Sequence, residues 1–128
     1  MLAILWLLLF AQSTSFEATF RLSLEALKRN DLAEARAGLE AAAKMRPDQA
    51  QVWLALAQTY WKLHEPERAG SAAVEAERIA PHDPLVLHAL GIFYSESGNF
   101  EKAAECEAEY ASKTPNDSGE VLAPFSFT

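Results

Sequence analysis

Two residue types recur along the chain at a fixed interval of 34 residues, the alanine always twelve residues before the proline. They are Ala35, Ala69 and Ala103, and Pro47, Pro81 and Pro115. Two residue types in phase over three units indicate an internal repeat, and a period of about 20–50 residues is typical of solenoids and other arrays. The chain therefore divides without gaps into units 16–49, 50–83 and 84–117, followed by a tail at 118–128.

The second and third units each open with apolar residues at i, i+3, i+4 and i+7, which form one continuous face of an α-helix. These residues are Trp53, Leu56, Ala57 and Tyr60 in the second unit and Leu87, Leu90, Gly91 and Tyr94 in the third. We expect the six large members of this set to be core residues. No segment alternates with a period of two residues, so the sequence predicts no sheet.

A short turn follows each of these first helices and leads to a second one. Asn30 and Gly98 tolerate the left-handed backbone that ends a helix. Asp31 and Asn99 can cap the next helix, and Glu34 completes a capping-box pattern with Asp31. The alanines are small where two helices would cross, and the prolines end the second helices. Each unit is therefore predicted to be an antiparallel pair of helices.

This pattern resembles the tetratricopeptide repeat, whose 34-residue signature reads W-x2-L-G-x2-Y, then A-x3-F, then P. The resemblance covers 16–117 and is weakest in the first unit, where Thr19, Leu22, Ser23 and Ala26 replace the large residues. It implies an all-α fold, a right-handed superhelical solenoid of three helix-turn-helix repeats. It also implies that the chain binds another protein, because arrays of this family line a concave groove with their first helices.

The groove implied by the resemblance would receive residues of the first helices that lie off the packing face. They are Phe20, Leu24, Leu27 and Lys28 from the first unit, Leu54, Gln58, Trp61 and Lys62 from the second, and Leu85, His88, Ile92 and Ser95 from the third. We predict that this surface binds an extended or helical peptide, with Trp61 as the anchor. Lys28 and Lys62 could meet an acidic group on the ligand. Alternatively, some of these side chains contact the N-terminal segment or a neighbouring chain.

Family members that clamp a carboxylate use Lys and Asn at two groove positions, which here are Phe20 and Leu24, so that activity is not inherited. The net charge of -7 disfavours a nucleic-acid partner, because phosphate binding needs an excess of Lys and Arg. Cys106 is the only cysteine, and the three histidines lack ligand spacing. No catalytic motif occurs either. We therefore predict that the chain is not an enzyme and expect neither a metal nor a cofactor.

The first residues differ in composition from the rest of the chain. Leu2 to Ala11 reads LAILWLLLFA, ten apolar residues without a charge. A membrane-spanning helix needs about 20 such residues, so we predict no stable membrane span. The run fits the apolar stretch of a secretory signal, about 7–15 residues long. Residues 1–13 are therefore predicted to be a signal peptide of a protein exported to the periplasm, the cell envelope or the medium. The alternative is a structural apolar helix in a cytoplasmic protein.

The leading hypothesis is a non-catalytic adaptor or scaffold that recruits one protein through the groove. The alternative is a self-associating unit that oligomerises through an uncapped third repeat. Arrays of this family usually end in a capping helix, and the tail 118–128 is too short to supply one. Either the apolar side chains of the tail fold back over the third repeat or another chain covers it; these side chains are Val121, Leu122, Phe125 and Phe127.

Overall fold

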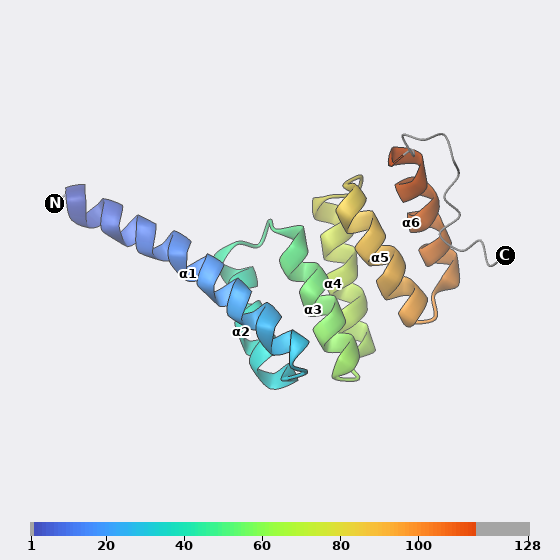
Figure 1. Ribbon diagram of the computed structural model, residues 1–128, viewed down its shortest axis with the longest axis horizontal. Helices are drawn as coiled ribbons and strands as arrows, with labels where there is room; N and C mark the ends of the chain where they lie inside the picture. The colour runs from blue at the N-terminus through green and yellow to red at the C-terminus, as the bar shows by residue number, and fades with distance from the viewer. Residues whose placement is uncertain (1, 115–128) are drawn as a thin grey trace. The chain divides into compact units, whose positions relative to one another are not determined.

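A computed structural model describes residues 2–114 of the chain, without the side chains of residues 8–14. The described residues form six α-helices and no strand, in agreement with the predicted all-α class (Figure 1). The helices are α1 (Leu2–Lys28), α2 (Leu32–Met45), α3 (Ala50–Lys62), α4 (Pro66–Ile79), α5 (Pro84–Glu96) and α6 (Phe100–Lys113). The predicted tail, with its apolar side chains, lies outside the described residues, as does Pro115.

The helices pack as consecutive hairpins, α1 with α2, α3 with α4, and α5 with α6. The chain divides into two compact units. Met1–Pro81 holds the first two hairpins, where α2 also packs on α3 and α1 contacts α3. His82–Thr128 holds the third hairpin.

A residue with left-handed backbone stands at the same repeat position in each hairpin turn. Asn30 has φ 62°, His64 has φ 63° and Gly98 has φ 85°. The amide of the residue after each one donates to a carbonyl five residues earlier, at 2.8–2.9 Å, which satisfies the end of the first helix. The predictions for Asn30 and Gly98 are confirmed. His64 was not predicted, because histidine is a weaker signal for this conformation.

The predicted caps of the second helices form, whereas the capping box does not. The carboxylate of Asp31 accepts from the amide of Glu34 at 3.4 Å, and the side chain of Asn99 accepts from the amide of Lys102 at 3.2 Å. The carboxylate of Glu34 instead accepts from the guanidinium of Arg29 at 3.2 Å. The backbone donor that a capping box requires is the amide of Asp31, and it already donates to the carbonyl of Ala26 at 2.8 Å.

The helix that begins at Leu2 continues without a break into the first repeat and ends at Lys28. The predicted signal segment and the first repeat helix are thus one helix in the structure. Leu2, Trp6 and the large apolar residues between them are 57–76% exposed. None of the helices in the described part of the chain is long and apolar enough to span a membrane.

Small buried residues let the two helices of each hairpin approach closely. In the first hairpin, a Cβ atom added to Gly38 of α2 would lie 2.0 Å from Oγ of Ser23 on α1. Ser23 is buried, and its hydroxyl donates to the carbonyl of Thr19 at 2.6 Å. The same two repeat positions hold small, buried residues in the other hairpins, Ala57 and Ala72 in the second and Gly91 and Cys106 in the third. A Cβ atom added to Gly91 would lie 2.5 Å from Oε1 of Glu107 on α6. Cys106 therefore occupies a packing position.

Four of the six predicted core residues are buried, namely Leu56, Leu87, Leu90 and Tyr94. Trp53 and Tyr60 are half-buried, so their prediction as core residues was wrong. Nε1 of Trp53 donates to the carbonyl of Pro47 at 2.8 Å, in the link between the hairpins. The hydroxyl of Tyr60 donates to Glu40 at 2.8 Å. Each ring packs through its apolar part and keeps its polar edge near the surface.

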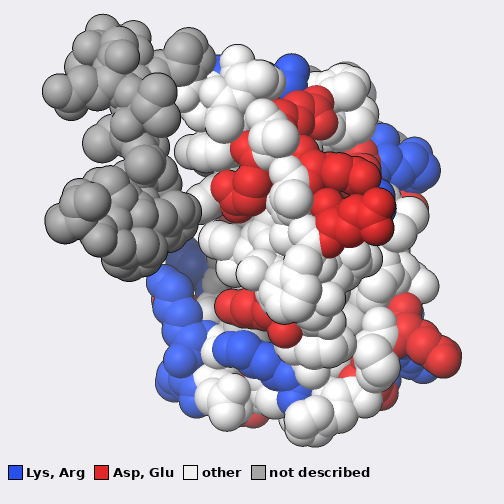
Figure 2. All heavy atoms as spheres, turned by 90° about the vertical axis from the view of Figure 1, so that its right-hand side faces the viewer, with Lys and Arg blue, Asp and Glu red and all other residues white. Residues whose placement is uncertain are grey.

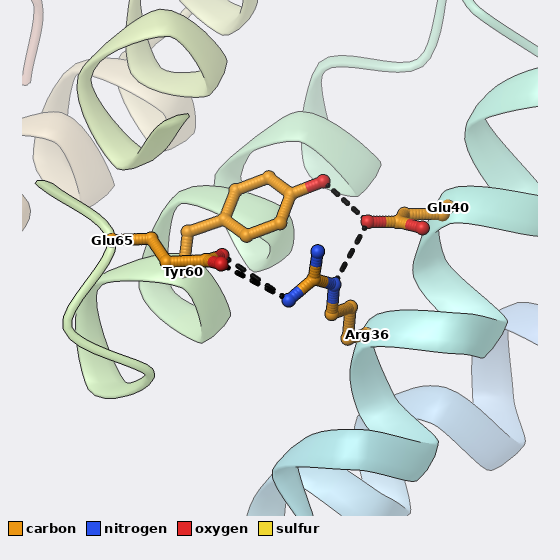
Figure 3. Close-up of polar contacts among 4 residues, drawn as sticks. All are labelled: Arg36, Glu40, Tyr60 and Glu65. Atoms are coloured by element: carbon orange, nitrogen blue, oxygen red, sulfur yellow. Dashed lines mark hydrogen bonds and ion pairs between the residues drawn. The ribbon is translucent and has the colours of Figure 1, made fainter. Parts of the chain in front are cut away.

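Four polar side chains join the first two hairpins, and we call them the α2–α3 network (Figure 3). They are Arg36 and Glu40 of α2, Tyr60 of α3, and Glu65, the residue before α4. The guanidinium of Arg36 donates to Glu40 at 3.2 Å and to both carboxylate oxygens of Glu65 at 3.2 and 3.3 Å. Since Glu40 also accepts from Tyr60, the network ties α2 to both helices of the second hairpin.

The α2–α3 network shifts the titration of its own members. The hydrogen bond from Tyr60 lowers the pKa of Glu40, and Arg36 adds to this effect. This carboxylate therefore stabilises the fold above its ordinary pKa, and the contribution is lost as the pH falls through the lowered value. Burial, together with Glu40, raises the pKa of Tyr60 to about 12. The tyrosine contribution is present below about pH 10 and is lost as the pH rises towards that raised value.

Gly38→Ala is expected to lower the free energy of unfolding by about 1–3 kcal/mol, because the new methyl group overlaps the buried Ser23. Gly70→Ala is the matched control, since a Cβ atom there meets no atom within 4 Å. That change should instead stabilise α4 by about 0.5–1 kcal/mol, the cost of a helical glycine relative to alanine. Urea unfolding of both variants measures the difference. Equal effects of the two substitutions would contradict the close approach of α1 and α2.

Tyr60→Phe removes the hydrogen bond that contributes most to the lowered pKa of Glu40. We expect the pKa of Glu40 to rise and the free energy of unfolding at neutral pH to fall by about 1 kcal/mol. An NMR titration of the Glu40 carboxyl carbon measures the first effect, and chemical unfolding measures the second. Tyr110→Phe, on α6, is the control and should leave Glu40 unchanged. A Glu40 pKa that stays the same in Tyr60→Phe would show that the pair is not formed in solution.

Candidate functional site

The predicted site residues of the first two repeats lie on two neighbouring helices of the same unit. We call this surface the α1–α3 face; it comprises Phe20, Leu24 and Lys28 of α1 and Leu54, Gln58, Trp61 and Lys62 of α3. The helices α1 and α3 contact each other directly (Figure 1). Three pairs of residues stand 34 positions apart and so occupy equivalent places on the two helices, namely Phe20 and Leu54, Leu24 and Gln58, and Lys28 and Lys62.

Apolar and polar side chains of the α1–α3 face differ in their exposure. Phe20, Leu24, Leu54 and Trp61 are half-buried, so each one packs on the helices and also borders water. The polar members are exposed, namely Lys28, Gln58 and Lys62. Large apolar side chains next to free polar groups are the usual composition of a surface that binds a peptide or a helix.

Leu27 was predicted to line the groove, but the structure places it in the core with 8% of its surface exposed. The reason is its helical register. Leu27 follows Ser23 by four residues, and residues at this spacing lie on the same side of a helix. Because Ser23 faces α2, Leu27 faces the hairpin interior as well. Leu27 therefore packs inside the first hairpin and is not available to a ligand.

Phe20 rests on a residue whose role the sequence analysis did not identify. The ring of Phe16 is buried and stacks on Phe20 with 5.9 Å between the ring centroids. The guanidinium of Arg46 lies 4.3 Å from the centroid of Phe16 and 3.5 Å from the carboxylate of Glu17. The spacing of four residues between the two phenylalanines was the available signal, because such pairs meet on a helix. Phe16 thus fixes the side of Phe20 that does not border water.

The predicted site residues of the third repeat belong to the other unit. His88 and Ile92 lie on α5 and are exposed, as are Leu85 and Ser95. The ring of His88 lies 4.9 Å from that of Tyr110 on α6, which orients it. These residues are described within their own unit, and their place in the predicted groove stays a prediction.

Other kinds of site find little support in the described residues. No group of three or more His, Cys, Asp or Glu side chains between residues 2 and 114 is arranged to hold a metal ion. A shallow depression of about 270 Å³ at the start of α4 is lined by the consecutive residues 65–68. One turn of one helix offers few converging groups, so we do not regard this depression as a binding site.

Comparisons with known proteins agree with this geometry. The structure of a protein described as Pseudomonas aeruginosa pilF superimposes with a TM-score of 0.71 and 25% sequence identity. The superposition covers 79% of this chain and 46% of that one, so the chain spans less than half the length of this relative. No curated protein sequence matches the chain.

A sequence profile gives the family. The profile described as tetratricopeptide repeat matches residues 20–84, slightly more than half of the chain. This stretch includes the first turn, the whole second hairpin and all residues of the α1–α3 face. The described helices form a helical repeat solenoid, as the resemblance implied. The chain belongs to the tetratricopeptide repeat family, whose members generally mediate protein–protein interaction.

Proposed function

We propose that this protein is a non-catalytic adaptor that binds a segment of another protein on the α1–α3 face. One observation carries the proposal: four large apolar side chains are half-buried on two helices that contact each other. None of the four occupies one of the buried positions where the two helices of a hairpin pack on each other. A stripe of this kind is expected to gain free energy when a partner removes it from water.

Trp61 is the anchor of the proposed site. Tryptophan contributes more than most residues at protein interfaces, because its large ring buries much area with few rotatable bonds. Its position near the end of α3 places it beside Lys62 and on the same helix as Leu54. A partner segment that crosses both helices could therefore contact the ring together with apolar side chains of α1.

Self-association through the third repeat has less support. The helix α6 buries Ala103 and Cys106, whereas Glu101, Glu105 and Glu107 are exposed. Figure 2 shows Asp and Glu side chains close together on the face that it presents. Stacking a second copy there would desolvate like charges, which disfavours a contact.

We further propose that the protein is exported, with residues 1–13 as its signal peptide. The support is the ten-residue apolar run, together with the exposure of the large side chains from Leu2 to Leu7. A helix that is apolar on all sides and exposed to water is costly for a mature protein. Removal of the segment would leave Phe16 and the rest of the first hairpin in place.

Trp61→Ala is expected to weaken the capture of a partner from the native source by about 2 kcal/mol or more while the protein stays folded. Trp53→Ala is the matched control on the same helix, since that ring is fixed to the carbonyl of Pro47. It should lower the melting temperature and leave capture unchanged below that temperature. Quantitative pull-down and thermal unfolding measure both effects. If Trp61→Ala recovers as much partner as the wild type does, the α1–α3 face is not the binding site.

N-terminal sequencing of the protein from its native source tests the export proposal. We expect the mature chain to begin within a few residues after position 13, because Ala11 and Ser13 supply the small side chains that signal peptidase requires. A soluble protein that retains Met1 would show that the apolar helix is structural. A fusion of residues 1–20 to a reporter that is active only outside the cytoplasm is an independent check.

A further inference from the structure

Three cations on or beside the α1–α3 face form no ion pair with a described carboxylate. Arg21 lies on α1 between Phe20 and Leu24, and Lys28 and Lys62 are the last residues of α1 and α3. All three are exposed. Within the described part of the chain, no carboxylate oxygen lies within 4.0 Å of any of these cations.

The charge of these three residues is opposite in sign to the net charge of the chain. The chain has 18 acidic residues and 11 basic ones, which gives it a net charge of -7. Arg29, Arg36, Arg46 and Arg78 each form an ion pair with a glutamate. Within the described part of the chain, Lys44, Arg68 and Lys113 form none within 4.0 Å, so the feature of interest is that three such cations lie on or beside one apolar surface. The α1–α3 face thus carries exposed cations without an ion pair, although the net charge of the chain is negative.

The fold does not require this charge. A lysine in the last turn of a helix interacts favourably with the helix dipole, which offers a structural reason for Lys28 and Lys62. The equivalent last residue of α5, however, is Glu96. A carboxylate is therefore tolerated at this repeat position, and the dipole contributes only about 0.3–1 kcal/mol at an exposed site.

We infer that the segment bound on the α1–α3 face carries carboxylates next to large apolar side chains. The inference rests on the proposed function and names the chemistry of the partner. Because Lys28 and Lys62 end neighbouring helices at equivalent positions, the carboxylates of the partner lie at that end, next to Trp61. Its apolar side chains then lie along Phe20, Leu24 and Leu54. Three cations on a chain of net charge -7 do not suit a nucleic acid, which needs many phosphate contacts.

The arrangement predicts which kinetic step the charges affect. Exposed charges around an apolar site steer an oppositely charged segment to it and have a smaller effect on its dissociation. Association should therefore slow down as salt screens the lysines, because the Debye length shortens from about 10 Å at 0.1 M salt to about 3 Å at 1 M. The apolar contacts should persist at high salt.

Selection from a phage-displayed library of random 16-residue peptides tests the inference with the full chain as bait. Four baits are compared at low salt after circular dichroism has shown each one to be folded: wild type, Trp61→Ala, the double variant Lys28→Glu and Lys62→Glu, and the control Lys44→Glu and Lys113→Glu. The control reverses two exposed lysines in the last turns of α2 and α6 and so matches the change in net charge.

Wild type and control are expected to enrich peptides with Leu, Phe or Trp followed or preceded by Asp and Glu. The variant Lys28→Glu and Lys62→Glu should enrich Lys and Arg in place of the acids. It should also bind a synthetic wild-type-selected peptide at least about tenfold more weakly at 50 mM salt than the control does, with a smaller difference at 500 mM.

Two results would overturn the inference. One leaves the proposed function in place, and the other contradicts the proposed function as well. If the Lys28→Glu and Lys62→Glu bait enriches the same acidic peptides as wild type while Trp61→Ala enriches none, the site stands and its proposed partner chemistry is wrong. If the peptides enriched by wild type are enriched equally by Trp61→Ala, or if wild type enriches none, the proposed function fails and the inference fails with it.

Discussion

The close approach of two helices at small buried residues is the constraint on which the rest of this structure depends. At the position of Ser23 and Gly38 the helices of the first hairpin leave no room for a methyl group. The same two repeat positions hold small residues in all three hairpins. Because each hairpin closes through alanine, glycine, serine and cysteine, its core needs few large side chains from the other faces of the first helices. Those faces are left free to carry a binding surface.

The α2–α3 network adds a second constraint, which holds the first two hairpins in one arrangement. Its chemistry is particular to this joint. The residues 34 positions after Arg36, Glu40 and Glu65 are Gly70, Val74 and Asn99, which cannot form ion pairs. Since the network ties α2 to α3 and α1 packs on α2, it also fixes α1 relative to α3. A binding face held in this way loses little conformational entropy on binding, which favours affinity.

Much of the fold could be predicted from the sequence, because its signals are local. Proline spacing, turn residues and helical periodicity each act within a few residues, and they led to the observed hairpins and to the left-handed residues Asn30 and Gly98. The surroundings of each side chain could not be predicted in the same way, because they depend on residues of other helices. Tyr60 and Tyr94 occupy the same repeat position, yet Tyr94 is buried while Tyr60 reaches a carboxylate on α2. The position of a residue in the repeat does not show which side chains of a neighbouring helix lie near it.

The candidate site shows the same division between position and environment. The family resemblance implied the residues of the α1–α3 face, but Leu27, which is equivalent to Trp61, proved to be buried. The three tryptophans now provide a direct test of where a partner binds, since Trp6, Trp53 and Trp61 lie on the N-terminal helix, at the hairpin link and on the face respectively. A partner segment is added stepwise to the ¹⁵N-labelled protein, and the indole N–H signals are followed by NMR. The signal of Trp61 should shift, whereas that of Trp53 should stay in place. A partner that binds without moving the Trp61 signal would contradict the account.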